Sequence, residues 1–236
     1  LRAIKQRAKA PAEEPESRLS CAEVLRALDV VGCERRDCVY IADVGSHQMT
    51  AAQRLMPIFE RGFITSGGLG AMGFGLPAAC GASIALSERD MPGNPAQIVL
   101  ICGDGGFQMT LQELATIVQE ELPIKIAILN NGYLGMVRQW QEMFYSGNYF
   151  GTPIIGPDFA KLAAAYGIWS TTVSDRAQVT EAIAAAQAVD GPALIDFRIE
   201  REENVFPIVP VGRPIDKMIR RPLESADCDA VREEHP

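Results

Sequence analysis

The sequence predicts an α/β fold with a doubly wound, mostly parallel β-sheet and helices on both faces. Short apolar runs rich in β-branched residues recur along the chain, which is typical of strands buried on both faces of a parallel sheet. Longer segments with helical periodicity separate these runs, and such alternation is the pattern of doubly wound sheets. The composition agrees with a globular domain, because 47% of the 236 residues are hydrophobic and 22% are charged.

The expected elements follow one another in a regular order. Strands are expected at residues 38–42, 98–102, 124–129 and 193–197, with a weaker candidate at 170–174. Helices are expected at residues 20–28, 71–86, 110–121, 134–144, 158–166 and 175–189. Ser20 and Glu23 have the spacing of a capping box, which predicts that the first helix begins there.

The composition also indicates how the chain is divided. Residues 1–19 are linker-like, because prolines interrupt a polar stretch at residues 8–17. Residues 20–202 form the predicted domain, and the proline-rich residues 203–236 are expected to be an extended tail.

Charge and cysteine usage exclude several classes of protein. The net charge of −8 and the pI of about 4.9 argue against a nucleic-acid binder, which needs clustered Lys and Arg. No apolar run approaches the roughly 20 residues that cross a bilayer, and the first residues lack the apolar core of a signal peptide. The six cysteines show no CxxC spacing, and Cys80 and Cys102 lie in apolar runs. We therefore expect a cytoplasmic protein without disulfides, zinc, membrane or nucleic-acid partners.

Polar and glycine-rich turns follow three of the expected strands. They begin at Asp43, Gly103 and Asn130. Ligands of open α/β sheets bind beyond the carboxyl ends of the strands, so these turns are expected to converge on one site.

Asp104 and Asn131 are candidate ligands for Mg²⁺ in this site. They are 27 positions apart, with one expected helix between them, as a β-α-β crossover requires. A carboxylate from Asp104, an amide oxygen from Asn131 and the carbonyl of Tyr133 would make half of an octahedral shell that phosphate oxygens and water could complete. Asp-Gly and Asn-Asn also occur in ordinary turns, so neither motif identifies a site by itself.

The combination resembles a known motif. Gly103-Asp104-Gly105, followed after 24 residues by Asn130-Asn131, resembles the thiamine-diphosphate-binding motif. The surrounding sequence resembles acetolactate synthase, also called acetohydroxyacid synthase, in segments 44–49, 66–77, 112–115, 134–140 and 204–210. The similarity spans residues 20–219 and corresponds to the C-terminal third of a catalytic subunit of that family.

The resemblance implies a role for each matching residue. Asp104, Asn131 and the Tyr133 carbonyl would hold Mg²⁺. The residues that would contact thiamine diphosphate are Gly45, Ser46, His47, Gly70, Ala71, Met72, Asp104, Gly105, Gly106, Asn131, Tyr133, Gly135 and Met136. The substrate pocket would be lined by Met136, Val137 and Trp140.

Without the resemblance, these residues have simpler interpretations. On helical periodicity, Met136 and Trp140 are better explained as core residues, and His47 as a hydrogen-bonded loop histidine. The family commonly has Gln, Trp and Ser where this chain has Ser46, Thr50 and Gly106. These differences bear on acceptor preference and diphosphate affinity rather than on the class of cofactor.

The activity that the resemblance implies is decarboxylation of pyruvate and coupling of the two-carbon unit to a second 2-oxoacid, in branched-chain amino acid biosynthesis. In this family an activating glutamate comes from a separate pyrimidine-binding domain, and a further domain binds FAD. Neither domain is recognisable here, so no catalytic residue is assigned, and the isolated chain is expected to be inactive without such a partner in a homodimer or tetramer. A thiamine-diphosphate-dependent 2-oxoacid decarboxylase and a non-catalytic cofactor-binding module are the alternatives.

Overall fold

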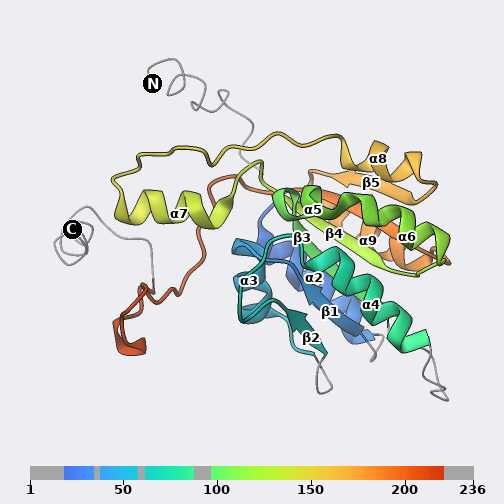
Figure 1. Cartoon of the computed structure of the whole chain (residues 1–236), viewed down its shortest axis with the longest axis horizontal. Helices are drawn as coiled ribbons and strands as arrows, with labels where there is room; N and C mark the ends of the chain where they lie inside the picture. Colours follow the sequence, from blue (N-terminus) through green and yellow to red (C-terminus); the bar gives the residue numbers. More distant parts are fainter. Residues whose placement is uncertain (1–18, 35–37, 58–61, 88–96, 221–236) are drawn as a thin grey trace.

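A six-stranded, fully parallel β-sheet forms the centre of the protein (Figure 1). The computed structural model describes residues 19–34, 38–57, 62–87 and 97–220. The spatial order of the strands is β2-β1-β3-β4-β6-β5. Their bounds are β1 Cys38–Ala42, β2 Phe63–Thr65, β3 Gln97–Gly103, β4 Lys125–Asn130, β5 Trp169–Val173 and β6 Ala193–Arg198.

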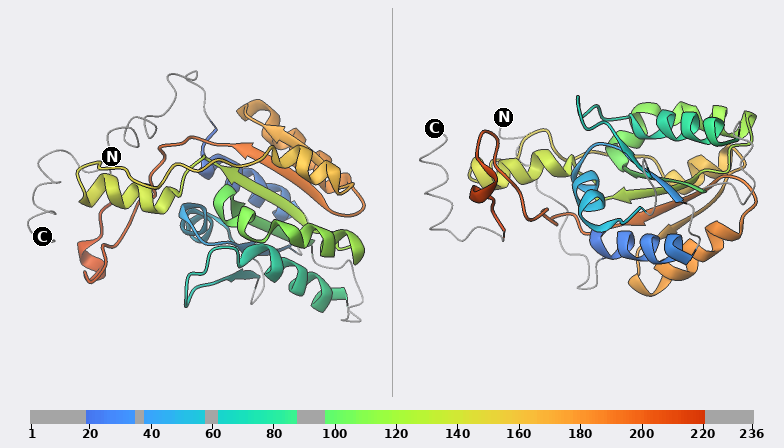
Figure 2. Two further views of the ribbon diagram at one scale, coloured as in Figure 1. Left: turned by 45° about the horizontal axis from the view of Figure 1, so that its top comes forward. Right: turned by 90° about the horizontal axis from the view of Figure 1, so that it is seen from below.

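Helices cover both faces of the sheet, which confirms the doubly wound architecture (Figure 2, right). One face packs against α2 (Cys21–Glu34), α3 (Ser46–Arg54) and α9 (Val179–Ala188). The other face packs against α4 (Gly75–Ser87), α5 (Asp104–Thr110), α6 (Leu114–Gln119) and α8 (Phe159–Ala165). Apolar side chains alternate between these two cores along each central strand, as the two-residue period of a strand requires.

The predicted strands agree with the observed strands to within one residue at each end. The first helix is also confirmed together with its cap. The Glu23 N–H donates to Ser20 Oγ over 3.2 Å, and the Ser20 N–H donates to Glu23 Oε2 over 3.0 Å. These reciprocal bonds are those of a capping box, and they fix the start of α2.

Several predicted boundaries are wrong, for identifiable reasons. α4 begins at Gly75 rather than at residue 71, because Gly70 and Gly73 adopt φ angles of +62° and +83°, in the left-handed region. The helix expected at residues 110–121 is divided into α5, a 3₁₀ turn at Leu111–Glu113 and α6. The helix expected at 175–189 begins with the 3₁₀ turn Arg176–Gln178 before α9.

α3 and β2 were not predicted. α3 begins in a glycine, serine and histidine turn that has the composition of a loop, and β2 has only three residues, each half-buried. Neither segment has the long apolar period on which sequence-based prediction depends.

Helix α7 (Gly135–Phe144) projects from the carboxyl edge of the sheet (Figures 1 and 2). An extended stretch, residues 145–157, leads back from α7 to α8. The segment after β6 runs out from the sheet toward the same helix and contains one 3₁₀ turn, Ile215–Lys217.

The limits of the domain are only partly within the described residues. Leu19 is fully buried and forms an isolated parallel bridge with Ile199. The linker-like residues 1–18 and the last part of the expected tail, 221–236, lie outside the described ranges. Within those ranges, none of the helices combines the length and apolar character needed to cross a membrane. Cys80 and Cys102 are buried as small apolar side chains, as expected.

Candidate functional site

The strand order changes direction between β1 and β3. From β1 the chain continues to β2 on one side, whereas β3 leads to β4 on the other side. Crevices that bind ligands form beyond the carboxyl ends of strands at such switch points. The turns after β1 and β3 meet there, because a Cβ atom on Gly103 would lie 3.1 Å from the His47 ring.

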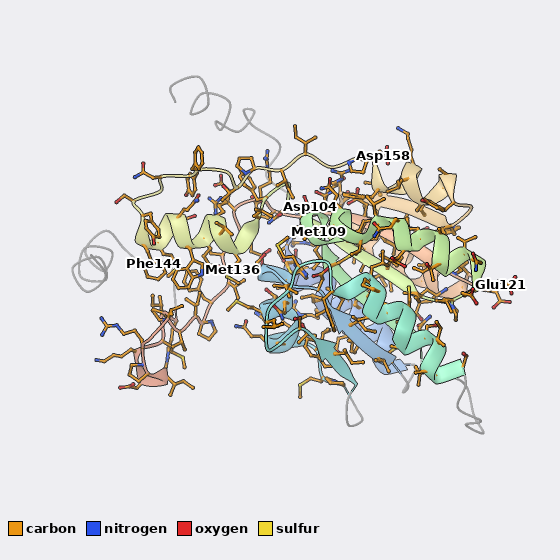
Figure 3. The ribbon with its side chains drawn as sticks, in the orientation of Figure 1. Asp104, Met109, Glu121, Met136, Phe144 and Asp158 are labelled. Carbon is orange, nitrogen blue, oxygen red and sulfur yellow. The ribbon has the colours of Figure 1, made fainter. Side chains whose placement is uncertain are left out.

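Asp104 is the first residue of α5 and lies at this edge of the sheet (Figure 3). Its side chain is 2% exposed, and its Oδ2 accepts a 3.1 Å hydrogen bond from the N–H of Gly132, in the turn after β4. Burial raises the pKa of Asp104 to about 6 against the effect of backbone hydrogen bonds, and Asp196 raises it further. The two predicted ligand turns are thus joined through one buried carboxylate.

Asn131 and Ser46 lie beside each other under the start of α7. Asn131 Oδ1 accepts a 3.1 Å hydrogen bond from the Tyr133 N–H, which folds the turn after β4 on itself. A Cβ atom on Gly135 would lie 2.8 Å from Ser46 Oγ and 2.9 Å from Asn131 Nδ2. Glycine is therefore required at position 135 if both polar side chains are to keep their places.

His47 is buried against the same turns. Burial lowers its pKa from 6.5 to about 4, and a hydrogen bond to the backbone of Asp43 opposes this shift. Its Nε2 atom is buried and has no hydrogen-bond partner among the residues that the structure describes. An unpaired polar atom of this kind is costly unless a ligand completes it.

Asp43 was not assigned a role from the sequence, yet it organises the glycine-rich loop. It is fully buried at the end of β1, and its carboxylate accepts 3.0 and 3.2 Å hydrogen bonds from the Gly73 N–H. Thr110 Oγ1 donates to the Gly73 carbonyl over 3.2 Å. A charged residue directly after a buried strand was the available sequence signal for this role.

The glycine-rich loop approaches α5 through one predicted residue. Met72 is half-buried, and its Cε would lie 3.4 Å from a Cβ atom on Gly105. Gly70 and Ala71 are exposed beside it. Gly106 faces the Asp43 carboxylate, because its Cβ would lie 2.8 Å from Asp43 Oδ2. The structure therefore brings Met72, Gly105 and Gly106 together and leaves Gly70 and Ala71 at the rim.

The three predicted pocket residues lie on α7. Met136 is at the end of the helix next to the sheet edge, and Phe144 is at its far end (Figure 3). Trp140 is half-buried and its ring centroid lies 4.7 Å from that of Phe144, whereas Val137 is 46% exposed. Met136 and Trp140 are one turn apart, so they share a face of the helix. Met136 and Trp140 are both half-buried, whereas Met143 on the same helix is buried.

The buried partner of Asn130, behind the site, escaped the sequence analysis. Asn130 Nδ2 donates to Asp196 Oδ1 over 3.0 Å, and Asp196 Oδ2 lies 2.7 Å from Arg198 Nη2. Asp196 is fully buried in β6, where the apolar pattern of the strand gave no reason to single it out.

These residues fit a diphosphate joined to a divalent cation. Asp104 is a buried carboxylate that forms no ion pair with the described residues, and a cation would stabilise its charged form. His47 Nε2 is placed to contact a ligand, because the other ring nitrogen makes the hydrogen bond to the Asp43 backbone. Across the described ranges, no group of three or more His, Cys, Asp or Glu is placed to hold a metal by itself. A cation here would also need oxygen atoms from the bound diphosphate, because Mg²⁺ commonly combines a few protein ligands with phosphate oxygens.

The fold and the site together define a class of protein. Residues 43–197 match the family described as "Thiamine pyrophosphate enzyme, C-terminal TPP binding domain". Thiamine pyrophosphate is another name for thiamine diphosphate. The chain belongs to this family, and the match runs from Asp43 to Phe197 in β6.

Individual relatives narrow the likeness to acetolactate synthases. The chain is 45% identical over 186 residues to the acetolactate synthase isozyme 2 large subunit of Escherichia coli (strain K12), covering 78% of this chain and 33% of that protein. It is 42% identical over 188 residues to the acetolactate synthase large subunit of Parasynechococcus marenigrum (strain WH8102), covering 79% of this chain and 29% of that one. The chain therefore spans about a third of the length of these relatives.

A solved structure shares the fold. It is the thiamine diphosphate-dependent 4-hydroxybenzoylformate decarboxylase of Rhodococcus jostii RHA1, with a TM-score of 0.69 and 28% sequence identity. The likeness covers 82% of this chain and 35% of that chain.

Proposed function

We propose that this chain supplies the cofactor-binding half of an acetolactate synthase that joins the two-carbon unit of pyruvate to a second 2-oxoacid. The observation that carries the proposal is the hydrogen bond between Asp104 Oδ2 and the Gly132 N–H, which joins both motif turns at the carboxyl edge of the sheet. The curated relatives named acetolactate synthase support the choice of activity.

The chain's own residues would divide the work of holding the cofactor. Asp104, Asn131 and the main-chain oxygen of Tyr133 would hold Mg²⁺. Around the diphosphate we place Gly45, Ser46, His47, Gly105, Gly106 and Gly135, and around the aminopyrimidine Gly70, Ala71 and Met72. The hydrogen bond from His47 to the Asp43 backbone leaves Nε2 of the neutral ring without a proton, so Nε2 would donate to the diphosphate in the protonated form of the ring, which the negative charge of the diphosphate favours.

Bound thiamine diphosphate would supply the carbon nucleophile and the electron sink that decarboxylation needs. Met136, Val137 and Trp140 would then shape the pocket for the two 2-oxoacids and exclude water from it. A water-poor pocket favours loss of the charged carboxylate.

The proposed active site is completed by another domain. We place the activating glutamate on a pyrimidine-binding domain, supplied by another chain or by further sequence, within a homodimer or tetramer in the cytoplasm. FAD would belong to the full enzyme and not to this chain. The exposed apolar side chains of the glycine-rich loop and of α7, Leu69 and Val137, support contact with a further domain at this edge.

The test combines the chain, Mg²⁺, thiamine diphosphate and pyruvate, with and without a pyrimidine-binding domain. We expect no turnover by the chain alone and 2-acetolactate from the assembly. Turnover by the chain alone would contradict the need for a partner domain.

The same assembly separates the alternative functions. Release of acetaldehyde instead of 2-acetolactate would identify a 2-oxoacid decarboxylase, an alternative favoured by the fold shared with the Rhodococcus enzyme. Asp104→Ala distinguishes a non-catalytic module. Loss of turnover with assembly intact supports an enzyme, whereas loss of assembly alone supports a module.

A further inference from the structure

Two glutamines on α7 make the same pattern of hydrogen bonds to different partners. Each side-chain amide pairs with both the N–H and the C=O of a single residue. Gln139 pairs with Val205, and Gln141 pairs with Phe150. The Gln141 pair is exposed and joins residues nine positions apart, whereas the Gln139 pair is buried and joins residues 66 positions apart.

The buried pair has good geometry on both sides. Gln139 Nε2 donates to the Val205 carbonyl over 2.9 Å, and its Oε1 accepts from the Val205 N–H over 3.0 Å. Gln139 is 1% exposed and Val205 is 6% exposed. Removing one side of a buried pair leaves the other side without a partner, which is more costly than losing a bond at the surface.

Val205 belongs to a connecting segment, residues 199–208, that is itself anchored on the sheet and on α2. The Ile199 N–H donates to the Asn130 carbonyl over 3.0 Å, and the Glu200 N–H donates to the Leu19 carbonyl over 2.7 Å. Glu203 Oε2 accepts a 2.7 Å hydrogen bond from the Cys21 N–H. The connecting segment is thus a fixed support rather than a free strand.

Neighbouring residues of α7 contact the same segment. Asn204 Nδ2 donates to Glu142 Oε1 over 3.0 Å, and Arg138 Nη2 lies 3.7 Å from Glu202 Oε1. Because Glu142 and Glu202 are 39% and 65% exposed, water weakens these charged contacts. The Gln139 pair is the buried contact of the group.

We propose that Gln139 is a positioning residue whose amide fixes α7 on the connecting segment and so sets where Met136 and Trp140 stand at the cofactor edge. The assignment of Met136 and Trp140 to a substrate pocket rests on the proposed function. The fixing of α7 itself rests only on the contacts of Gln139.

The chain offers an internal reporter for this inference. It contains two tryptophans, Trp140 on α7 and Trp169 in β5. In a Trp169→Phe background, Trp140 fluorescence reports on α7 alone. We compare Gln139→Leu with Gln141→Leu, because each replaces an amide with an apolar side chain of similar size and removes two hydrogen bonds to one backbone residue; Gln139→Leu also removes the 3.5 Å contact of Nε2 with Met143 Sδ.

We expect Gln139→Leu to loosen α7 while the sheet stays folded. Trp140 emission moves to longer wavelength, and the amides of α7 exchange with solvent about ten- to a hundredfold faster. In Gln141→Leu the exchange of α7 stays within about twofold of the parent, as for an ordinary surface change.

Two results would overturn the inference. One is that both variants give the same emission and the same exchange of α7. The other is that Gln139→Leu speeds exchange in the central strands as much as in α7, because Gln139 would then support the whole fold.

A kinetic measurement connects α7 to the substrate in the assembled enzyme. Gln139→Leu is expected to raise KM for the 2-oxoacid severalfold, more than it weakens thiamine diphosphate binding, because most of the proposed cofactor contacts lie at the sheet edge and not on α7. An unchanged KM with a loosened α7 would remove the link to the pocket. If the assembly formed no 2-acetolactate at all, the proposed function would fail, while fluorescence and exchange would still decide the position of α7.

Discussion

Asp104 and His47 are both buried in the candidate site. Burial shifts their pKa values in opposite directions, up for Asp104 and down for His47. Burial holds Asp104 in its protonated form up to about pH 6 and holds His47 neutral down to about pH 4. The raised pKa of Asp104 means that folding loses stability as pH rises from about 4 through 6. The lowered pKa of His47 means that folding loses stability as pH falls from 6.5 to about 4.

The two effects overlap in pH, so single variants must separate them. His47→Asn removes only the second effect. We expect the wild type to lose about 3 kcal/mol of unfolding free energy relative to the variant between pH 7 and pH 4. Urea unfolding at a series of pH values measures this difference, with His235→Gln as the control. Parallel pH profiles for the wild type and His47→Asn would contradict a buried neutral imidazole.

A substitution at Gly135 tests how closely Ser46 and Asn131 pack against the start of α7. Its Cβ would lie 2.8 Å from Ser46 Oγ, so Gly135→Ala is expected to displace Ser46 or Asn131 and to weaken Mg²⁺-dependent thiamine diphosphate binding at least about tenfold. Gly81→Ala in α4 is the matched control, because its Cβ meets nothing within 4 Å. Alanine there should leave binding unchanged and stabilise the helix by about 0.5–1 kcal/mol. Calorimetric titration of the assembled protein compares them, and equal binding would contradict the packing.

At the level of elements, the strands could be predicted because burial on both faces leaves a short apolar run with few other interpretations. β3 and β4 show this, and the convergence of their turns followed from a general property of parallel sheets. Helix boundaries were less predictable. The start of α4 depends on the left-handed backbone at Gly73, which Asp43 and Thr110 hold from other parts of the chain.

The parts of the site that escaped prediction depend on contacts between residues far apart in the sequence. Asp43 binds a loop 30 positions away, and Gln139 binds a segment 66 positions away. No local pattern distinguishes Gln139 from Gln141, although Gln139 is buried and Gln141 is half-buried. The motif residues could be predicted from the sequence, whereas the residues that support them could be identified only from the three-dimensional structure.

Helix α5, which begins with Asp104, is held by aromatic packing. The rings of Phe107 and Phe159 meet edge to face with centroids 5.5 Å apart, and both are fully buried. We expect Phe159→Ala to lower the unfolding free energy by about 3–5 kcal/mol, because it leaves a cavity under α5. Phe150→Ala, at a side chain that is 62% exposed, should change it by less than about 0.5 kcal/mol. Urea unfolding tests both, and equal losses would contradict the role of this pair.

At the scale of the whole molecule, the proposed active site lies at one edge of the chain. Its described residues place a carboxylate, an amide and an unpaired imidazole nitrogen at the switch point of the sheet, and it spans about a third of its acetolactate synthase relatives. Helix α7 and the glycine-rich loop border this edge, where the proposed pyrimidine-binding domain would close the site. The proposed chemistry would therefore belong to the assembly, whereas the proposed metal and diphosphate anchor would belong to this chain.

That anchor is tested most directly by metal binding in the assembled protein. Mn²⁺ replaces Mg²⁺ in oxygen-ligand sites, and its electron paramagnetic resonance signal distinguishes free from bound ion. With thiamine diphosphate present, the wild type and the exposed control Asp190→Asn should bind Mn²⁺ alike. Asp104→Asn, which keeps the shape of the side chain, should bind it at least about tenfold more weakly. Equal Mn²⁺ affinity in Asp104→Asn and the wild type would contradict the account.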